Sequence, residues 1–328
     1  MTAPRILVLG TGGTIAGAGA RATGAAYRPG GLALEAMLGN LAALGLAAEL
    51  VPQEIARIGS QDIGFAEWQA LNAACAAALA DPDIVGVIIT HGTDTAEETA
   101  FLLDLTLPTH KPVVLVGAMR AADAVGADGM RNFANAVKVA SDGQASGRGV
   151  MLVMGDAVLA ARDARKSATS AIDAFRSFPR GPLARVTPSS LDWFGPPHRL
   201  GAAAGYPFPD ALPRVAILTA GAGMDEQPVA ALLGIGCKGM VLAGMGQGNA
   251  PASVIAALAE AAASGVPVVR STRVDEGIVD RNVEVDDDAL GLVAARALGP
   301  AKARMLLMVL IANGVTDAAA VQAAFDGG

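Results

Sequence analysis

Residues 5–17 read RILVLGTGGTIAG, a continuous apolar run that passes directly into a glycine-rich turn. A run without polar alternation is typical of a strand that is buried on both faces of a sheet. A second run, Ile84–Ile89, passes in the same way into THGTDT at residues 90–95. Both turns therefore place hydroxyls and backbone N–H groups at the carboxyl end of a strand, where open α/β sheets bind ligands.

Apolar runs of the same kind alternate with stretches of helical spacing along the chain. This alternation predicts parallel sheets with helices on both faces. The capping-box pattern Thr95-Ala96-Glu97-Glu98 predicts a helix start just after THGTDT. The expected strands are 5–10, 48–52, 84–90, 112–117, 150–154, 214–219, 239–243 and 266–270. The expected helices are 32–44, 66–80, 96–105, 131–141, 227–233, 251–264, 286–298 and 300–313.

The composition of the sequence changes between residues 187 and 212, where prolines and glycines are frequent and hydrophobic periodicity is weak. Such a stretch is typical of a connection between domains. We therefore expect a larger domain at 1–190, a linker at 191–212 and a smaller parallel α/β domain at 213–328.

Composition limits the partners that the chain can have. Its 328 residues are 52% hydrophobic and carry a formal net charge of −7, with a pI near 5.0. An acidic chain without basic runs disfavours nucleic acid and anionic membranes as partners. Two widely spaced cysteines, Cys75 and Cys237, indicate buried thiols rather than a disulfide framework. The first strand begins so close to Met1 that we expect a cytoplasmic protein, or a periplasmic one only if a leader was removed.

The sequence lacks the motifs of several common enzyme classes. Ile15 stands where the dinucleotide-binding fingerprint needs Gly or Ala, and no phosphate-loop lysine motif is present. The chain has neither a zinc-ligand spacing nor a GxSxG nucleophile turn. Threonine hydroxyls can still act as covalent nucleophiles when a Lys or Tyr accepts the proton and N–H groups stabilise the oxyanion. The two turns therefore point to acyl transfer, specifically amide hydrolysis.

The two turns, taken together with several other segments, resemble the bacterial L-asparaginase family in sequence and order. The similarity spans about residues 5–325, and the first two motifs are highly specific in combination. It implies a flavodoxin-like larger domain with a parallel sheet. The resembling motifs are TGGTIAG (11–17), GSQD (59–62), THGTDT (90–95), VGAMR (116–120), ARD with the lysine at 166 (161–166), GQGN (246–249), VRSTR (269–273) and VEVDD (283–287).

The resemblance implies catalytic roles for particular residues. Thr14, the second threonine of TGGTIAG, matches the primary nucleophile. Tyr27 matches a tyrosine of the following loop that assists this nucleophile. Thr93 matches a second catalytic threonine, and Lys166 matches a lysine that pairs with Thr93 and Asp94.

The resemblance also implies how the substrate is bound. Asp94 would hold the α-ammonium of the substrate, and Ser60 and Gln61 would hold its α-carboxylate. The Ala118 backbone carbonyl would accept a hydrogen bond from the side-chain amide. These roles agree with the chemistry of a free amino acid, which needs one partner for its ammonium and one for its carboxylate.

Two further residues are implied to reach the site from a neighbouring subunit of a homotetramer built as a dimer of dimers. Asn249 matches a substrate-binding position, and Glu284 matches a catalytic carboxylate that acts together with Tyr27. Gln247 stands where secreted relatives often carry another amide, which leaves the preference between asparagine and glutamine open.

The expected activity is hydrolysis of L-asparagine to L-aspartate and ammonia through a threonine acyl-enzyme, with L-glutamine as a second amide and with no cofactor or metal. Two alternatives remain open at this point. One is an asparaginase-like subunit of a tRNA-dependent amidotransferase, which the acidic charge disfavours. The other is a non-enzymatic amino-acid sensor, which would not need Thr14, Thr93 and Lys166 together.

Overall fold

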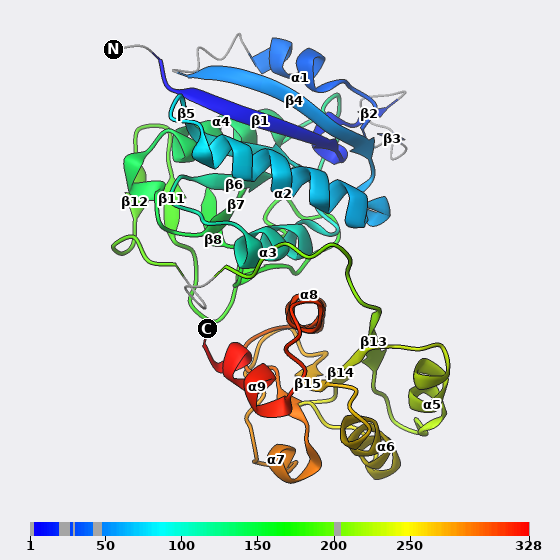
Figure 1. The fold of residues 1–328 in the computed structure, drawn as a ribbon. Helices are drawn as coiled ribbons and strands as arrows, with labels where there is room; N and C mark the ends of the chain where they lie inside the picture. The colour runs from blue at the N-terminus through cyan, green and yellow to red at the C-terminus, as the bar shows by residue number, and fades with distance from the viewer. Residues whose placement is uncertain (1–2, 20–26, 29, 42–47, 200–204, 328) are drawn as a thin grey trace. The chain divides into compact units, whose positions relative to one another are not determined.

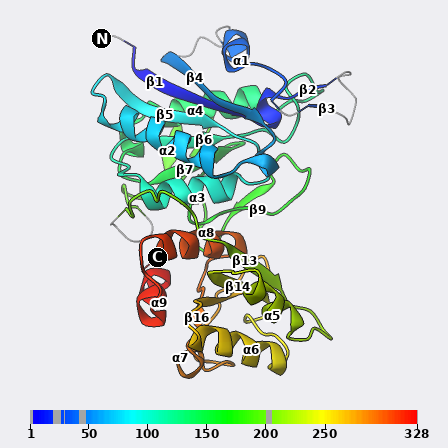
Figure 2. The ribbon, with the colours of Figure 1, turned by 45° about the vertical axis from the view of Figure 1, so that its right-hand side comes forward.

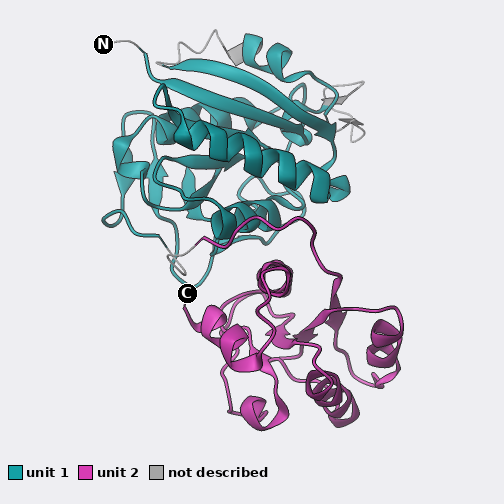
Figure 3. Ribbon diagram, in the orientation of Figure 1, with its two compact units in different colours: residues 1–200 teal, residues 201–328 magenta. Residues whose placement is uncertain are grey.

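The computed structural model describes the chain except for residues 1–2, 20–26, 29, 42–47, 200–204 and 328. The described chain divides into two compact units, unit 1 (Met1–Leu200) and unit 2 (Gly201–Gly328) (Figure 3). Strand β12 (Leu191–Trp193) lies inside the stretch that we expected to be a linker, and it pairs antiparallel with β11 (Ala184–Val186). The α/β class with two separate sheets is confirmed.

Unit 1 is built on an eight-stranded sheet with the order β12-β11-β8-β7-β6-β5-β1-β4. The strands from β7 to β4 are parallel, and β8, β11 and β12 form an antiparallel edge. The sequence pattern predicts the central parallel strands because they are continuous apolar runs, whereas β11 and β12 have only three residues each and are too short to show a period. The remaining bounds are β1 (Arg5–Gly12), β4 (Glu49–Ile58), β5 (Ile84–Thr90), β6 (Val113–Val116), β7 (Val150–Met154) and β8 (Ala157–Ala160).

Helices cover both faces of this sheet (Figures 1 and 2). On one face, α1 (Leu34–Leu41) and α4 (Gly129–Ala140) bury Leu34 and Phe133 against the strands. On the other face, α2 (Phe65–Ala80) and α3 (Ala96–Thr106) bury Leu71 and Leu103. Burial on both faces explains why β1, β5, β6 and β7 carry no polar alternation, whereas the edge strand β4 has exposed polar positions.

The direction of chain progression through the sheet reverses at β1. The chain passes from β1 to the edge strand β4 and then returns to β5 on the other side of β1. At such a reversal the loops that follow neighbouring strands turn to opposite faces and leave a crevice at the carboxyl ends. The loops after β1 and β5 contain Thr14 and Thr93, so the sheet topology places both threonines at this crevice.

Two small hairpins add to unit 1. Strand β2 (Ala18–Gly19) pairs antiparallel with β3 (Tyr27–Arg28). Strand β9 (Ala164–Lys166) pairs antiparallel with β10 (Phe175–Ser177), and this pairing holds Lys166 in an extended segment.

The start of α3 differs from its prediction in one respect. The helix begins at Ala96 as expected, but the Thr95 side chain does not cap it. Instead, Thr95 Oγ1 donates a hydrogen bond to the Ser60 backbone oxygen at 2.7 Å. The predicted helix start is confirmed, but the prediction that the Thr95 hydroxyl caps it is wrong, because a long-range acceptor takes that hydroxyl.

Unit 2 contains a four-stranded parallel sheet with the order β13-β14-β15-β16. Helices α5 and α6 lie on one face of it and α8 on the other (Figures 1 and 2). The bounds are β13 (Val215–Thr219), α5 (Gln227–Gly234), β14 (Gly239–Gly244), α6 (Ala252–Ala263), β15 (Val268–Thr272), α7 (Asp287–Leu290), β16 (Val293–Ala294), α8 (Pro300–Ala312) and α9 (Ala318–Asp326).

The predicted helix 286–298 is wrong beyond its first turn. Helix α7 ends at Leu290, because Gly291 adopts a left-handed conformation with φ +67° that reverses the chain. The next residues, Val293–Ala294, form β16 and pair with β15. Their apolar spacing fits a strand as well as a helix over so few residues.

Candidate active site

Three loops of unit 1 approach one another backbone to backbone. A Cβ atom on Gly13 would lie only 2.4 Å from Gly92 Cα, and one on Gly92 would lie 2.7 Å from Ser60 Oγ. Gly13 also has a φ of +75°, which favours glycine. The glycines of TGGT and HGTDT therefore allow the two threonine turns and the Ser60 loop to touch.

These loops line a cavity of about 100 Å³. This volume is well below the roughly 300–1,000 Å³ of pockets for drug-sized ligands, so the cavity fits a small molecule. Among the described residues that line it, one lysine and one aspartate carry charge, and the others offer hydroxyl, amide, thioether and backbone groups. The lining residues are Gly13, Thr14, Gly59, Ser60, Gln61, Gly92, Thr93, Asp94, Met119, Lys166 and Thr169.

A lysine contacts the second threonine turn directly. Lys166 Nζ donates to Thr93 Oγ1 at 2.9 Å and to Asp94 Oδ1 at 2.6 Å. The Thr93 side chain is buried, whereas the Asp94 side chain is 64% exposed. Because a carboxylate has about four acceptor positions, Asp94 can accept from Lys166 and still receive a second cation from the cavity.

Thr14 begins a short 3₁₀ helix, η1 (Thr14–Ala16), immediately after the Gly12-Gly13 turn. Its side chain is buried and lines the cavity. The turn is joined to the next loop through Thr11, whose Oγ1 donates to the Thr90 backbone oxygen at 2.9 Å. Hydroxyls of the two predicted catalytic threonines therefore belong to one cavity.

His91 supports the second threonine turn from inside the protein. It is fully buried, and its Nδ1 lies 2.7 Å from the Gly92 backbone oxygen. Because a carbonyl oxygen can only accept, Nδ1 carries the proton. Burial lowers the pKa of His91 to about 4, so the ring is neutral at pH 7.

The loop after β6 is held by Asp128 and Asn132. The Asp128 carboxylate accepts hydrogen bonds from the backbone N–H groups of Met119 and Arg120, at 3.0 to 3.1 Å. Asn132 Nδ2 donates to the Gly117 backbone oxygen at 2.9 Å. Ala118 lies in this loop and is fully buried, but its neighbour Met119 lines the cavity instead.

Two lining residues, Met119 and Thr169, were not singled out by sequence reasoning as site residues. Thr169 lies in a Ser- and Ala-rich stretch without a motif, so no local signal could have identified it. Met119 belongs to the VGAMR segment, which resembles the family, but its role was not distinguishable from that of Ala118.

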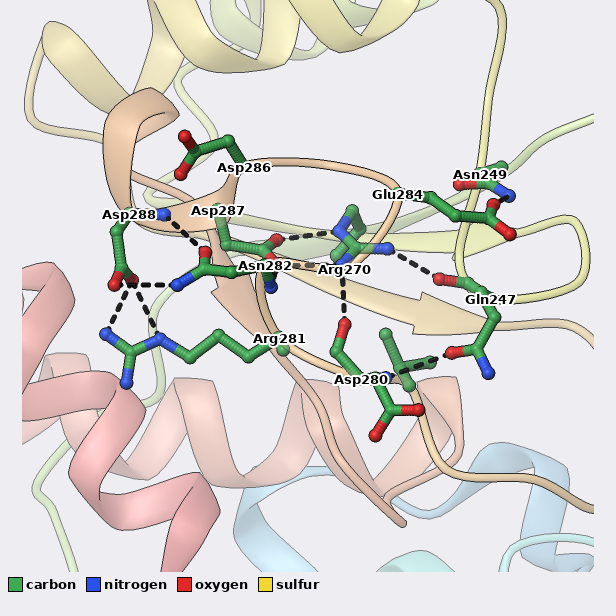
Figure 4. Close-up of polar contacts among 12 residues, drawn as sticks. Gln247, Asn249, Arg270, Asp280, Arg281, Asn282, Glu284, Asp286, Asp287 and Asp288 are labelled. Carbon is green, nitrogen blue, oxygen red and sulfur yellow. Dashed lines mark hydrogen bonds and ion pairs between the residues drawn. The ribbon is translucent and has the colours of Figure 1, made fainter.

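Tyr27, Asn249 and Glu284 are not among the described residues that line this cavity. Tyr27 contributes its backbone to β3, and its side chain lies outside the described part of the structure. Asn249 and Glu284 belong to unit 2, where Asn249 Nδ2 donates a hydrogen bond to the Glu284 carboxylate (Figure 4).

A larger cavity, about 580 Å³, lies elsewhere in unit 1, and its described lining residues do not include a lysine. Four of its charged side chains are engaged with one another in the ion pairs Arg131–Asp156 and Arg176–Asp173. The hydroxyl of Ser177 donates to the Gly181 backbone oxygen. We therefore assign the candidate active site to the smaller cavity, where a hydroxyl contacts a lysine.

The described residues contain no group of three or more His, Cys, Asp or Glu side chains arranged to hold a metal ion. Over the same part of the chain, every helix is too short or too polar to cross a membrane. Cys75 and Cys237 are free and buried, and burial raises the pKa of Cys75 to about 12.

The cavity, in which Lys166 contacts the Thr93 hydroxyl, contains groups of the kind that acyl transfer uses. Residues 5–199 match the family model described as "Asparaginase, N-terminal", and residues 214–325 match "Glutaminase/Asparaginase C-terminal domain". The chain therefore belongs to the asparaginase family, as the resemblance of its motifs indicated.

Individual relatives agree with this assignment. The chain is 42% identical to the probable periplasmic L-asparaginase of Haemophilus influenzae, over 94% of this chain and 88% of that protein. It is 40% identical to L-asparaginase 2 of Escherichia coli, over 94% and 89%. It is also 37% identical to the glutaminase-asparaginase of Pseudomonas fluorescens, over 93% and 86%. The crystal structure of a probable cytoplasmic L-asparaginase from Campylobacter jejuni matches with a TM-score of 0.93 and 35% identity, over 99% of both chains.

Proposed function

We propose that this protein hydrolyses L-asparagine to L-aspartate and ammonia, with L-glutamine as a second amide substrate. The observation that carries the proposal is the hydrogen bond between Lys166 Nζ and Thr93 Oγ1 in the cavity that Thr14 also lines. The names of the relatives support the same activity, since they are L-asparaginases and glutaminase-asparaginases. Neither alternative that the sequence left open, the amidotransferase subunit or the sensor, has support among them.

Substrate recognition follows from the charges of the cavity. The exposed carboxylate of Asp94 binds the α-ammonium of the amino acid, as its free acceptor positions permit. The Ser60 and Gln61 side chains, with nearby backbone N–H groups, bind the α-carboxylate. The Ala118 carbonyl orients the side-chain amide. Partners for both charged ends select a free amino acid over an amide within a peptide.

Catalysis proceeds by two displacements. The Thr14 hydroxyl attacks the side-chain amide carbon, and its proton leaves through Tyr27 and Glu284. Backbone N–H groups of the glycine turns stabilise the oxyanion, the C–N bond breaks, and ammonia departs with a proton. Water, activated by the Thr93–Lys166 pair, then attacks the acyl ester and releases aspartate, and a proton of this water restores the Thr14 hydroxyl.

The assembly in this proposal is a homotetramer built as a dimer of dimers, in which Asn249 and Glu284 complete the site of a neighbouring subunit. Dilution below the dissociation constant of the assembly is then expected to abolish activity. A cytoplasmic location stays a prediction, because similar proteins are described as periplasmic and as cytoplasmic.

The test measures ammonia release from free L-asparagine and L-glutamine by the purified protein without tRNA. Thr14→Val is expected to lower kcat by several orders of magnitude while the circular dichroism spectrum is unchanged, because the variant lacks the nucleophile. Thr316→Val, the same change at an exposed threonine of unit 2, is the matched control. Near wild-type turnover by Thr14→Val would disprove the nucleophile, and tight asparagine binding without turnover by the wild type would favour the sensor.

A further inference from the structure

Arg270, on strand β15, is an arginine buried in unit 2 with only 1% of its side chain exposed. Its guanidinium forms a two-pronged ion pair with Asp287, in which Nε and Nη2 donate to the two carboxylate oxygens at 2.7 and 2.8 Å. The Asp287 side chain is fully buried as well. The sequence motifs VRSTR and VEVDD contain these two residues, but the proposed reaction gives neither of them a role.

The remaining donors of Arg270 reach two different loops (Figure 4). Nη1 donates to the Gln247 backbone oxygen at 2.5 Å, and Nη2 donates to the Asp280 backbone oxygen at 3.1 Å. The loops are also joined directly, because the Asp280 N–H donates to Gln247 Oε1 at 3.0 Å. Asp287 accepts a further bond from the Asn282 N–H at 3.0 Å. We call Arg270, Asp287, Gln247, Asp280 and Asn282 the Arg270 cluster.

The backbone of the first loop is shaped to meet this cluster. Gly248 has a φ of +82°, and a Cβ atom on it would lie 3.0 Å from Arg270 Nη1. The same loop is closed by reciprocal backbone hydrogen bonds between Met245 and Asn249, each 2.7 Å long. The loop is therefore built to approach the guanidinium closely.

The cluster lies next to both unit 2 residues of the proposed site. Asn249 follows Gln247 by two residues, and Glu284 follows Asn282 by two residues. The Asn249 side chain donates to the Glu284 carboxylate across the gap between the loops (Figure 4). The cluster thus connects the two backbone segments whose separation decides how Asn249 and Glu284 face each other.

A buried ion pair is a weak source of stability, because desolvation of both charges offsets their attraction. Apolar side chains of similar volume would fill the same space without this cost. What an arginine adds is a planar fork that binds several acceptors in fixed directions. Three separate segments accept hydrogen bonds from this one side chain, so Arg270 fixes the positions of these segments relative to one another.

We propose that Arg270 and Gln247 are positioning residues of the hydrolytic reaction: they fix the two loops so that Asn249 and Glu284 form one preformed polar pair. This inference rests on the proposed function, in which that pair contributes to an active site. Gln247 then acts through Glu284 and Asn249, because its side-chain oxygen is engaged by the Asp280 N–H.

The test uses Gln247→Leu in the full-length protein, because substitutions of Arg270 leave Asp287 buried without its cation and can unfold the chain. The variant is expected to lower kcat/KM for asparagine roughly 10- to 100-fold, mainly through kcat, since misplacement of about 1 Å has effects of this size. Arg281→Lys is the matched control. Its side chain pairs with the exposed Asp288 in the first turn of α7, and this variant should keep wild-type kcat/KM.

A double-mutant cycle separates positioning from general stabilisation. If Gln247 acts through Glu284, adding Gln247→Leu to Glu284→Gln should lower kcat/KM by less than about twofold further, because the interaction is already lost. Losses that multiply would overturn the inference. Activity retained by Gln247→Leu but lost in Glu284→Gln would also overturn it and leave the proposed function intact.

Hydrogen–deuterium exchange supplies a readout that does not need activity. Peptides covering residues 245–250 and 280–286 should exchange faster in Gln247→Leu and at the wild-type rate in Arg281→Lys. Unchanged exchange in Gln247→Leu would show that the cluster does not hold the loops. Wild-type protein that releases no ammonia would refute the proposed function instead. Hydrogen–deuterium exchange would then still show whether the Arg270 cluster holds the two loops.

Discussion

The contact between Gly13 and Gly92 gives the most direct test of how the two threonine turns are brought together. In Gly13→Ala the new Cβ would lie 2.4 Å from Gly92 Cα, whereas ordinary contacts begin near 3.4 Å. The two turns must therefore separate by about 1.0 Å. Overpacking of this kind costs about 1–3 kcal/mol, in addition to about 1–2 kcal/mol for an alanine at positive φ.

Gly147→Ala isolates the effect of the contact. Gly147 has the same φ of +75°, but no atom lies within 4 Å of the position that its Cβ would take. The cost of a positive φ is then present in both variants, and Gly13 adds the cost of its ψ of −171°, a region that is almost exclusive to glycine. For a unit of about 200 residues, 1 kcal/mol corresponds to about 2–4 °C in Tm, so the contact alone should make Gly13→Ala melt roughly 2–12 °C below Gly147→Ala.

The assays are thermal unfolding of both variants and ammonia release from asparagine. A displacement of about 1 Å between Thr14 and Thr93 should lower kcat about 100-fold in Gly13→Ala, while Gly147→Ala keeps wild-type kcat. Equal Tm values and equal turnover for the two variants would refute the conclusion that backbone contact between the turns assembles the site.

Two further predictions concern charged and titratable groups near the site. Asp94→Asn should lower kcat/KM for asparagine roughly 10- to 100-fold, since a hydrogen bond to a charged group is lost. The Tm of this variant should change little, because the Asp94 side chain is mostly exposed. Unchanged kcat/KM would exclude Asp94 as the ammonium partner. His91 has a pKa of about 4 when folded and an ordinary value of 6.5 when unfolded, so the unfolded chain binds the proton first as the pH falls. Stability should therefore decline between about pH 6.5 and 4 by up to about 3 kcal/mol, and this decline should be absent in His91→Gln, measured by urea unfolding at each pH. A wild-type curve parallel to that of His91→Gln would show that His91 does not remain neutral in the folded protein.

The sequence predicted the central parallel strands because their burial on both faces leaves a continuous apolar pattern. Strands β1 and β5 lie where expected, and so do the turns that follow them. The short elements were less predictable. The stretch 286–298 has apolar residues compatible with helix or strand, and a left-handed Gly291 decides the outcome. The Thr95 hydroxyl likewise was assigned to a helix cap, but the loop that supplies its acceptor is 35 residues away in sequence.

The candidate site was also only partly predictable from the sequence. The sequence pointed to the two hydroxyl-rich turns, because each turn is read locally from its own residues, and the resemblance then implied roles for Thr14, Thr93 and Asp94 within them. Lys166 was identified only through resemblance, since nothing near it indicates that it contacts Thr93 from 73 residues away. The catalytic roles of these residues stay predictions until the variants are measured.

The amino-acid sequence by itself determined that this chain forms α/β units with hydroxyl-rich turns after buried strands, since apolar periodicity and glycine content act over a few residues. Only the tertiary structure decided that Gly13 packs against Gly92, that Lys166 meets Thr93, and that one buried arginine joins two loops of unit 2. These contacts depend on strand order and on close packing between segments that are distant in the chain. No local pattern encodes such distances, because they arise only when the whole sheet is assembled.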